Sequence, residues 1–216
     1  MVIIMKNEAV KSPRLLETSS NSSKKLHTIV KIAILTALAA IIMLFEIPLP
    51  FAPSFYKLDL SEIVILMGGF AMGPVAAVVM ELLKNLLNIL LNGTSTAYIG
   101  EFANFVTSCA LVLPASIIYK YRKTLNGAII ALIAGTLSLT IVGSLLNYFL
   151  LIPAFSEFYH LPIDDIINMG SAVNPLVTDL KTLVMFAVAP FNIVKGVVCS
   201  VVSLLLYKRL SRILHI

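Results

Sequence analysis

The sequence predicts an all-α integral membrane protein, a bundle of six transmembrane helices with the N and C termini on the cytoplasmic side. Its 216 residues are 59% hydrophobic and only 12% charged, whereas soluble domains are roughly 25% charged. Apolar runs close to the roughly 20 residues that cross a bilayer follow one another along the chain. A third observation, the placement of Lys and Arg, predicts the orientation.

Six apolar runs are the candidate spans, and segments rich in polar residues, Pro or Gly separate them. The runs cover residues 29–45, 61–72, 74–91, 100–119, 127–152 and 182–206. The second run has the length of a short or broken helix and ends at Gly73-Pro74. Irregular backbone at membrane depth is tolerated where it is buried in protein or lines a cavity. A short helix beside the Pro-rich loop 47–53 therefore indicates a pocket.

The remaining segments are expected to lie outside the bilayer. Residues 1–28 are polar and rich in Ser, Lys and Asn, and we expect a disordered cytoplasmic tail. The apolar start, 1–5, is too short for the core of a signal peptide. Residues 29–207 then form one membrane domain, and residues 208–216 form a basic cytoplasmic end. Within the domain, 153–178 is expected to be a long outer loop.

Basic residues are distributed asymmetrically in this topology. Twelve Lys and Arg fall in its cytoplasmic segments, and only Lys57 and Lys181 fall in its outer loops. The outer loops carry seven acids: Glu46, Asp59, Glu62, Glu157, Asp164, Asp165 and Asp179. This pattern follows the positive-inside rule. It also accounts for the net charge of +5 without a nucleic-acid partner.

Polar side chains recur at helical spacing on the third run. Glu81, Lys84, Asn85 and Asn88 fall on one face, which must point into the bundle. A charged side chain near a helix centre costs about 2.5–3.5 kcal/mol on insertion scales, so it faces a cavity or a partner. Because Glu81 and Lys84 are three residues apart, we favour mutual neutralisation over a function for this pair.

A second set of polar side chains belongs to the outer half of the membrane in this topology. The set is Asn88, Glu101, Asn104, Asn147 and Asn192. Lys195 lies one turn beyond Asn192, and its own helix offers no acid within a turn. Its charge needs a carbonyl, a distant carboxylate or a ligand, of which we favour a ligand. The sequence thus predicts a polar site that opens outward.

No catalytic or metal-binding motif is visible in the sequence. It contains no Walker motif, GxSxG or HExxH. Cys109 and Cys199 lie in apolar runs without the spacing of a metal or redox site. These features favour a binding or transport subunit that draws energy from partners, without a cofactor or metal. The alternative from another class is a membrane enzyme that uses Glu81, Lys84 and Glu101 for proton transfer.

Four segments carry a resemblance to a known family. They read KLDLSEI at 57–63, GGFAMGP at 68–74, ELLKNLL at 81–87 and GEFANF at 100–105. Together they resemble the riboflavin-specific substrate-binding S component of energy-coupling factor (ECF) transporters, over roughly residues 29–207. The resemblance implies a vitamin binder in the plasma membrane of a prokaryote. It also implies association with an ECF module, made of a transmembrane T subunit and two cytoplasmic ATPases.

The resemblance further implies roles for individual residues. Asn147, Asn192 and Lys195 match flavin contacts, and their groups suit the carbonyls and ring nitrogens of an isoalloxazine. The other predicted site residues are Lys84, Asn88, Glu101 and Asn104, with Leu44, Phe45 and Phe105 as apolar neighbours. The loop between the first two helices matches a gate, with Pro48, Pro50, Phe51, Pro53, Phe55, Tyr56 and Lys57.

Ala33 and Ala37 form an AxxxA pattern on the first helix. Spacing alone favours internal helix packing for such small residues, whereas the resemblance implies a docking face for the T subunit.

The resemblance leaves one alternative for the ligand. In this alternative, the chain is an S component for another vitamin or a flavin precursor.

Overall fold

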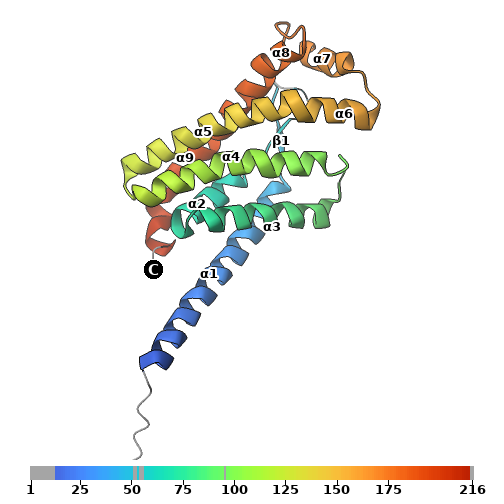
Figure 1. The fold of residues 1–216 in the computed structure, drawn as a ribbon. Helices are drawn as coiled ribbons and strands as arrows, with labels where there is room; N and C mark the ends of the chain where they lie inside the picture. The colour runs from blue at the N-terminus through green and yellow to red at the C-terminus, as the bar shows by residue number, and fades with distance from the viewer. Residues whose placement is uncertain (1–12, 51–52, 54–55, 95, 215–216) are drawn as a thin grey trace, which may run out of the picture.

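The protein is described by a computed structural model that covers residues 13–50, 53, 56–94 and 96–214. Figure 1 shows a bundle of helices from which the long helix α1, Pro13–Met43, extends to one side. The following elements are β1 (Ile47–Pro48), β2 (Lys57–Leu58), α2 (Glu62–Met72), α3 (Pro74–Asn92), α4 (Ile99–Tyr121), α5 (Leu125–Leu146), the π-helical turn η1 (Asn147–Leu151), α6 (Ile152–Tyr159), α7 (Ile163–Ser171), α8 (Leu180–Leu183), the π-helical turn η2 (Val184–Val188) and α9 (Ala189–Leu214).

Five helical segments in the described residues are long and apolar enough to cross a membrane. They are Lys25–Met43, Pro74–Asn92, Ile99–Tyr121, Leu125–Tyr159 and Leu180–Tyr207. Each overlaps one of the predicted runs. The remaining predicted run, 61–72, corresponds to α2, which is apolar but shorter than the other five.

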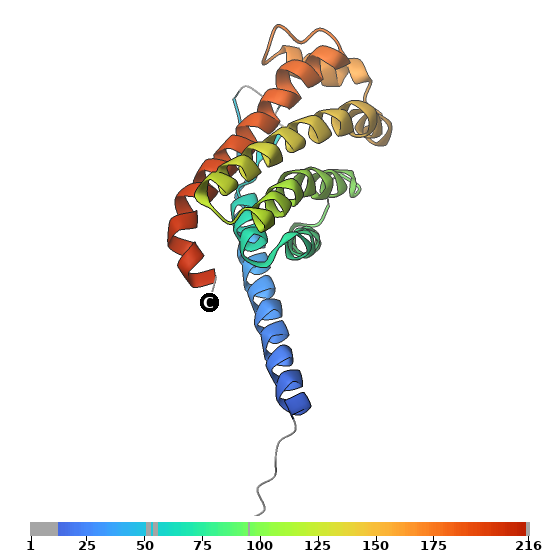
Figure 2. The ribbon, with the colours of Figure 1, turned by 60° about the vertical axis from the view of Figure 1, so that its left-hand side comes forward.

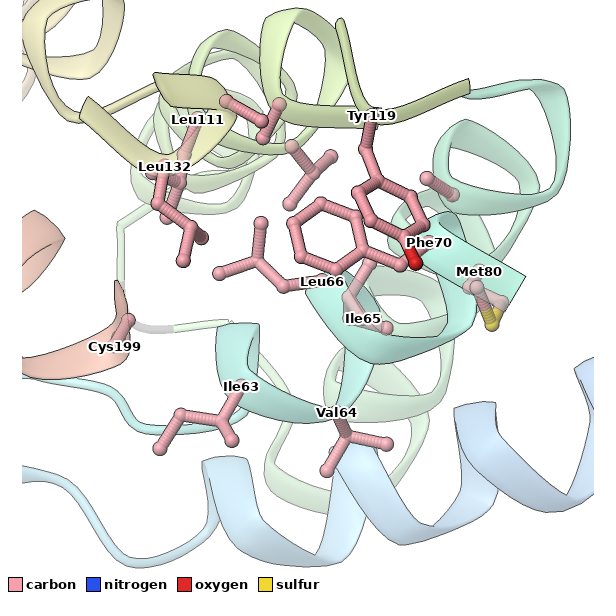
Figure 3. Close-up of a cluster of buried hydrophobic side chains, with 14 of the residues drawn as sticks. Ile63, Val64, Ile65, Leu66, Phe70, Met80, Leu111, Tyr119, Leu132 and Cys199 are labelled. Atoms are coloured by element: carbon pink, nitrogen blue, oxygen red, sulfur yellow. The ribbon is translucent and has the colours of Figure 1, made fainter. Parts of the chain in front are cut away.

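Helix α2 lies inside the protein. It contacts α1, α3, α4 and α9, and residues 62–70 are all buried. Leu66 on α2 points toward Leu132 of α5 (Figure 3), and Ile65 of α2 and Leu111 of α4 are fully buried in the same core cluster. A helix that is apolar on every face is expected in such an interior position. It ends at Gly73, whose φ of +94° suits glycine, and Pro74 then occupies the first turn of α3.

The loop between α1 and α2 is closed at its base by a two-residue hairpin. Ile47 pairs with Leu58, and Pro48 pairs with Lys57, in an antiparallel register. An exposed ion pair between Lys57 and Glu46, at 3.1 Å, lies beside it. The hairpin therefore holds both ends of the loop together, next to the start of α2.

The expected disordered tail is wrong for residues 13–28, which form the first part of α1 (Figure 2). Residues 1–12 lie outside the described residues. Pro13 is compatible with a first helical turn, and Leu15, Leu16 and Glu17 favour helix. The apolar span that follows nucleates the helix, and extension into the polar segment then adds one hydrogen bond per residue.

The expected outer loop at 153–178 is also wrong in part, because α6 and α7 occupy much of it. Helix α5 runs through η1 into α6 without a break, and Pro153 is accommodated in the first turn of α6. His160, with φ +52°, ends α6. A capping box of Asp179 and Thr182 begins α8, and these hydrogen bonds lower the pKa of the Asp179 carboxyl.

Candidate functional site

A cluster of charged side chains lies buried where α2 and α3 meet. Nζ of Lys84 is 2.8 Å from Oε2 of Glu81 and 2.9 Å from Oε1 of Glu62. Oδ2 of Asp59 is farther from the same ammonium, at 3.8 Å. Lys84, Glu62 and Glu81 are fully buried, and Asp59 is nearly so. The ammonium and carboxylates offset one another's desolvation cost, as buried charges require.

The cluster extends to α4 through hydrogen bonds. Ser108 donates its hydroxyl hydrogen to Oε1 of Glu62. Asn104 donates to Oδ1 of Asn85 at 3.2 Å, and Asn85 donates to the carbonyl oxygen of Glu81 at 2.9 Å. The polar stripes predicted on the third and fourth runs therefore meet each other. The predicted Glu81–Lys84 pair is confirmed as an ion pair.

Asp59 and Glu62 are predicted among the acids of the outer loops, and the structure corrects this for Glu62. Both are buried, and Glu62 begins the central helix α2. The reason is that carboxylates at this depth have Lys84 as a partner, so their burial is compensated. One signal in the sequence points to this placement, because Glu62 directly precedes an apolar run that contains no other charge.

A second polar group lies where the loop after α1 approaches α5 and α9. Tyr56 donates its hydroxyl hydrogen to Oδ1 of Asn147, at 2.5 Å, and Asn147 donates to the carbonyl oxygen of Gly143 at 2.8 Å. The ring of Tyr56 lies 5.3 Å from that of Phe191, tilted by 38°. Desolvation raises the pKa of the Tyr56 phenol, so the hydroxyl remains a donor.

Asn192 carries a buried donor without a partner. Its side chain is 5% exposed, and Nδ2 has no hydrogen bond among the described residues. It lies against Gly143 so closely that a Cβ at position 143 would be 2.6 Å from Nδ2. Because buried polar groups are almost always hydrogen-bonded, an unpartnered amide indicates a place for a ligand or a water molecule.

Lys195 lies one turn after Asn192 on α9 and approaches the charged cluster. Its Nζ is 3.7 Å from Oε1 of Glu62, and the residue is 5% exposed. The sequence left open a carbonyl, a distant carboxylate or a ligand as its partner. The structure provides a carboxylate from α2, but at a distance too long for a hydrogen bond.

Comparison with known families identifies the chain. The profile of the family described as ECF transporter, substrate-specific component, matches residues 27–207. The chain belongs to this family. Among relatives of this S component, the riboflavin transporter RibU of Staphylococcus aureus (strain TCH60) is 37% identical over 186 residues, which cover 86% of this chain and 91% of the relative. The riboflavin transporter FmnP of Bacillus subtilis (strain 168) is 31% identical over 190 residues, 87% of this chain and 93% of the relative.

A solved structure resembles the fold of this S component over nearly its full length. The S component of a bacterial ECF transporter superposes with a TM-score of 0.70 at 34% sequence identity. The match covers 88% of this chain and 98% of the other. The chain is therefore a multi-pass membrane protein of a prokaryotic transport system and not an enzyme, which excludes the proton-transfer alternative.

Several of the predicted ligand residues of this S component come together. Asn147 and Asn192 both contact Gly143, and Lys195 is joined through Glu62 to Lys84. Asn104 belongs to the same network through Asn85. Tyr56, predicted as part of the gate, reaches Asn147 directly. Gly143 and Phe191 were not predicted, because a small residue or an aromatic in an apolar run carries no polar signal.

Other predicted residues have partners elsewhere. Asn88 accepts a hydrogen bond from Asn92 at 2.8 Å, near the end of α3. Glu101 accepts one from Thr96, also at 2.8 Å, at the start of α4. Neither is hydrogen-bonded to Asn147, Asn192 or Lys195 in the described part of the chain. Leu44 and Phe45 are 42% and 71% exposed, and Phe105 is half-buried.

Five of the seven predicted gate residues are described. Pro48 and Lys57 lie at the hairpin, Pro50 is exposed and Pro53 is buried. Phe51 and Phe55 lie outside the described residues. In the part of the chain that is described, no group of three or more His, Cys, Asp or Glu side chains is arranged to hold a metal ion.

Proposed function

We propose that this chain binds riboflavin with high affinity and delivers it for uptake as the S component of an ECF-type transporter. The observation that carries the proposal is the buried Nδ2 of Asn192, which has no hydrogen bond among the described residues and lies on the same side of the bundle as Lys195, Asn147 and Tyr56. The named functions of the RibU and FmnP relatives support the choice of riboflavin. The protein itself has no ATPase role, because energy comes from its partners.

The chemistry of these groups suits an isoalloxazine ring. Its two carbonyl oxygens and ring nitrogens accept hydrogen bonds, and its imide N–H donates one. Lys195 supplies donors, and the amides of Asn147 and Asn192 each supply both donors and acceptors. The rings of Tyr56 and Phe191 offer flat apolar surface for the aromatic faces. A planar ligand in a largely preformed site loses little conformational freedom, which favours tight binding.

We place the entrance of the site at the loop between α1 and α2. Tyr56 joins this loop to Asn147, so movement of the loop changes access to the ligand groups. We assign gating to Pro48, Pro50, Phe51, Pro53, Phe55, Tyr56 and Lys57. Leu44, Phe45, Phe105, Asn88, Glu101 and Lys84 complete the predicted site.

The proposed topology has six crossings, with α2 as the short one and both termini in the cytoplasm. The excess of Lys and Arg on the proposed inner side supports this orientation. Ala33 and Ala37 are both exposed on α1, whereas Thr36 and Ala40 on the same helix are buried. An exposed face of small residues permits close approach of another helix. It is therefore the proposed docking face for the T subunit of an ECF module that also contains two ATPases.

The experiment that tests the proposal is a titration of the protein, purified in mild detergent, with riboflavin while flavin fluorescence is followed. The proposal requires stoichiometric quenching at nanomolar concentrations, or a yellow preparation that already contains the vitamin. A folded, colourless protein that leaves riboflavin fluorescence unchanged contradicts the riboflavin assignment. Mass spectrometry of a copurified small molecule would then show whether another vitamin or a flavin precursor occupies the site.

A further inference from the structure

One carboxylate oxygen of Glu62 is approached by two ammonium groups and a hydroxyl, each from a different helix. Oε1 is 2.9 Å from Nζ of Lys84 on α3 and 3.7 Å from Nζ of Lys195 on α9. Ser108 on α4 donates a hydrogen bond to the same atom. Glu62 is fully buried, and α2 itself packs against all three helices. The position of its carboxylate is thus determined from several sides.

The ammonium of Lys195 is held differently from that of Lys84. Lys84 lies within hydrogen-bond distance of Glu62 and Glu81, whereas Lys195 is 3.7 Å from Glu62, beyond that distance. Attraction between opposite charges still acts strongly over this separation in a buried site. The described residues provide no hydrogen bond to Nζ of Lys195, so its hydrogens remain available for a ligand.

The backbone on both sides of this contact is fixed. Cys199, one turn after Lys195, lies beside the start of α2 (Figure 3), and its Sγ is 3.8 Å from the carbonyl oxygen of Asp59. The carboxylate of Asp59 accepts hydrogen bonds from the backbone N–H and the hydroxyl of Ser61, each at 2.7 Å. Asp59 is therefore committed to the turn before α2. Among the described residues Glu81 pairs with Lys84, whereas Glu62 forms an ion pair with Lys195 as well as with Lys84.

We propose that Glu62 is a positioning residue for ligand binding, which holds the charged ammonium of Lys195 in place before the ligand arrives. A lysine side chain loses rotamer entropy when it is held in one position, and a site that restricts it in advance binds more tightly. The inference rests on the proposed riboflavin function. It differs from a purely structural role, because it requires the effect of Glu62 on affinity to pass through Lys195.

The chain offers a matched control for this test. Glu81 is as buried as Glu62 and pairs with Lys84 at nearly the same distance, but it forms no ion pair with Lys195 within the described residues. Riboflavin titrations of Glu62→Gln, Glu81→Gln, Lys195→Met and the double variant Glu62→Gln/Lys195→Met separate the two roles. Thermal unfolding of each purified protein shows that it is folded at the temperature of the titration.

We expect Glu62→Gln to weaken riboflavin binding about tenfold, as for directly coupled groups, and Glu81→Gln to change it less than about twofold. In the Lys195→Met background, Glu62→Gln should cause no further loss. The visible absorption spectrum of riboflavin bound to Glu62→Gln should also move toward that of the Lys195→Met complex. A merely structural role would not produce this convergence of spectra.

Three outcomes overturn the inference while leaving the riboflavin function intact. The first is unchanged riboflavin affinity in Glu62→Gln when Lys195→Met weakens binding. The second is an equal loss of affinity in Glu62→Gln and Glu81→Gln. The third is a loss of affinity in the double variant that equals the sum of the two single losses. A folded wild-type protein that does not bind riboflavin instead removes the proposed function. If Glu62→Gln does not fold, Ser108→Ala takes its place, since it removes the hydrogen bond to Glu62 and keeps the charge. Its loss of affinity must then disappear in the Lys195→Met background, and a persistent loss contradicts the inference.

Discussion

The hydroxyl of Tyr56, in the loop after α1, donates a 2.5 Å hydrogen bond to Oδ1 of Asn147, 91 residues later in the chain. This contact ties the proposed gate to a proposed ligand residue. Tyr56→Phe should increase the rate of riboflavin dissociation, because loss of one hydrogen bond costs about 0.5–1.5 kcal/mol. The ring contact with Phe191 is retained in this variant. Stopped-flow recovery of flavin fluorescence measures the rate.

The control for the gate is Tyr148→Phe. Tyr148 is adjacent to Asn147 in sequence, but it is 37% exposed, and its hydroxyl makes no hydrogen bond in the described structure. Its replacement should leave the dissociation rate unchanged. Equal rates in wild-type protein and Tyr56→Phe would show that this hydrogen bond does not restrain the gate.

Asn192→Ala and Lys195→Ala should each weaken riboflavin binding by about 1–3 kcal/mol, the cost of leaving a buried polar partner unsatisfied. Both residues are 5% exposed, so water does not readily replace them. Equilibrium fluorescence titration gives the affinities. Asn168→Ala, on the exposed surface of α7, is the control and should bind as the wild type does. Unchanged affinity in both site variants removes this assignment of the ligand groups.

Gly143→Ala tests the position of the Asn192 amide. A Cβ at residue 143 would be 2.6 Å from Nδ2 of Asn192, so the amide must move away from its present place. Riboflavin affinity should fall, because the amide is displaced from its place in the site. The protein should remain folded, since overpacking by one methyl group typically lowers stability by only about 1–3 kcal/mol. Titration and thermal unfolding are measured together.

Gly135→Ala provides the comparison, since its Cβ would be 2.5 Å from the carbonyl oxygen of Leu111 in the core. That variant should lower the unfolding temperature and leave the affinity of the folded protein unchanged. If Gly143→Ala binds riboflavin normally, the amide of Asn192 does not contact the ligand in its present position.

Replacing both Ala33 and Ala37 by Leu should disrupt association with the ECF module and leave riboflavin binding intact. Both alanines are exposed on α1, and larger side chains prevent the close helix approach that small residues permit. Copurification of the T subunit and ATPases measures association. Val201→Leu, on the exposed face of α9, controls for added volume on an exposed helix face. Normal copurification of the double variant would place the docking face elsewhere.

The spans were predictable because their apolar runs are long. The predicted run 74–91, for example, corresponds to helix α3, Pro74–Asn92. The helices within 153–178 were not predictable, since η1 and a Pro in the first turn of α6 carry α5 onward in a way that local sequence does not signal. Glu62 was missed as a partner of Lys195 for a similar reason. In sequence it borders a loop, and only the packing of α2 among α3, α4 and α9 brings it to both lysines.

Lys84→Met should strongly destabilise the fold, because it leaves the carboxylates of Asp59, Glu62 and Glu81 buried with less positive charge nearby. Removal of one member of a buried charge group costs about 3–5 kcal/mol. The midpoint of thermal unfolding in detergent should therefore fall well below that of the wild type. Lys57→Met breaks only the exposed pair with Glu46 and should change the midpoint little.

The double variant Lys84→Met/Glu81→Gln then tests how much of the loss comes from the uncompensated carboxylate of Glu81. Since Gln has nearly the shape of Glu without its charge, the second substitution should restore part of the unfolding temperature that Lys84→Met removes. Recovery in the double variant attributes the loss to uncompensated carboxylates. A midpoint as low as in Lys84→Met alone would mean that the methylene chain and ammonium of Lys84 stabilise the bundle through contacts other than Glu81.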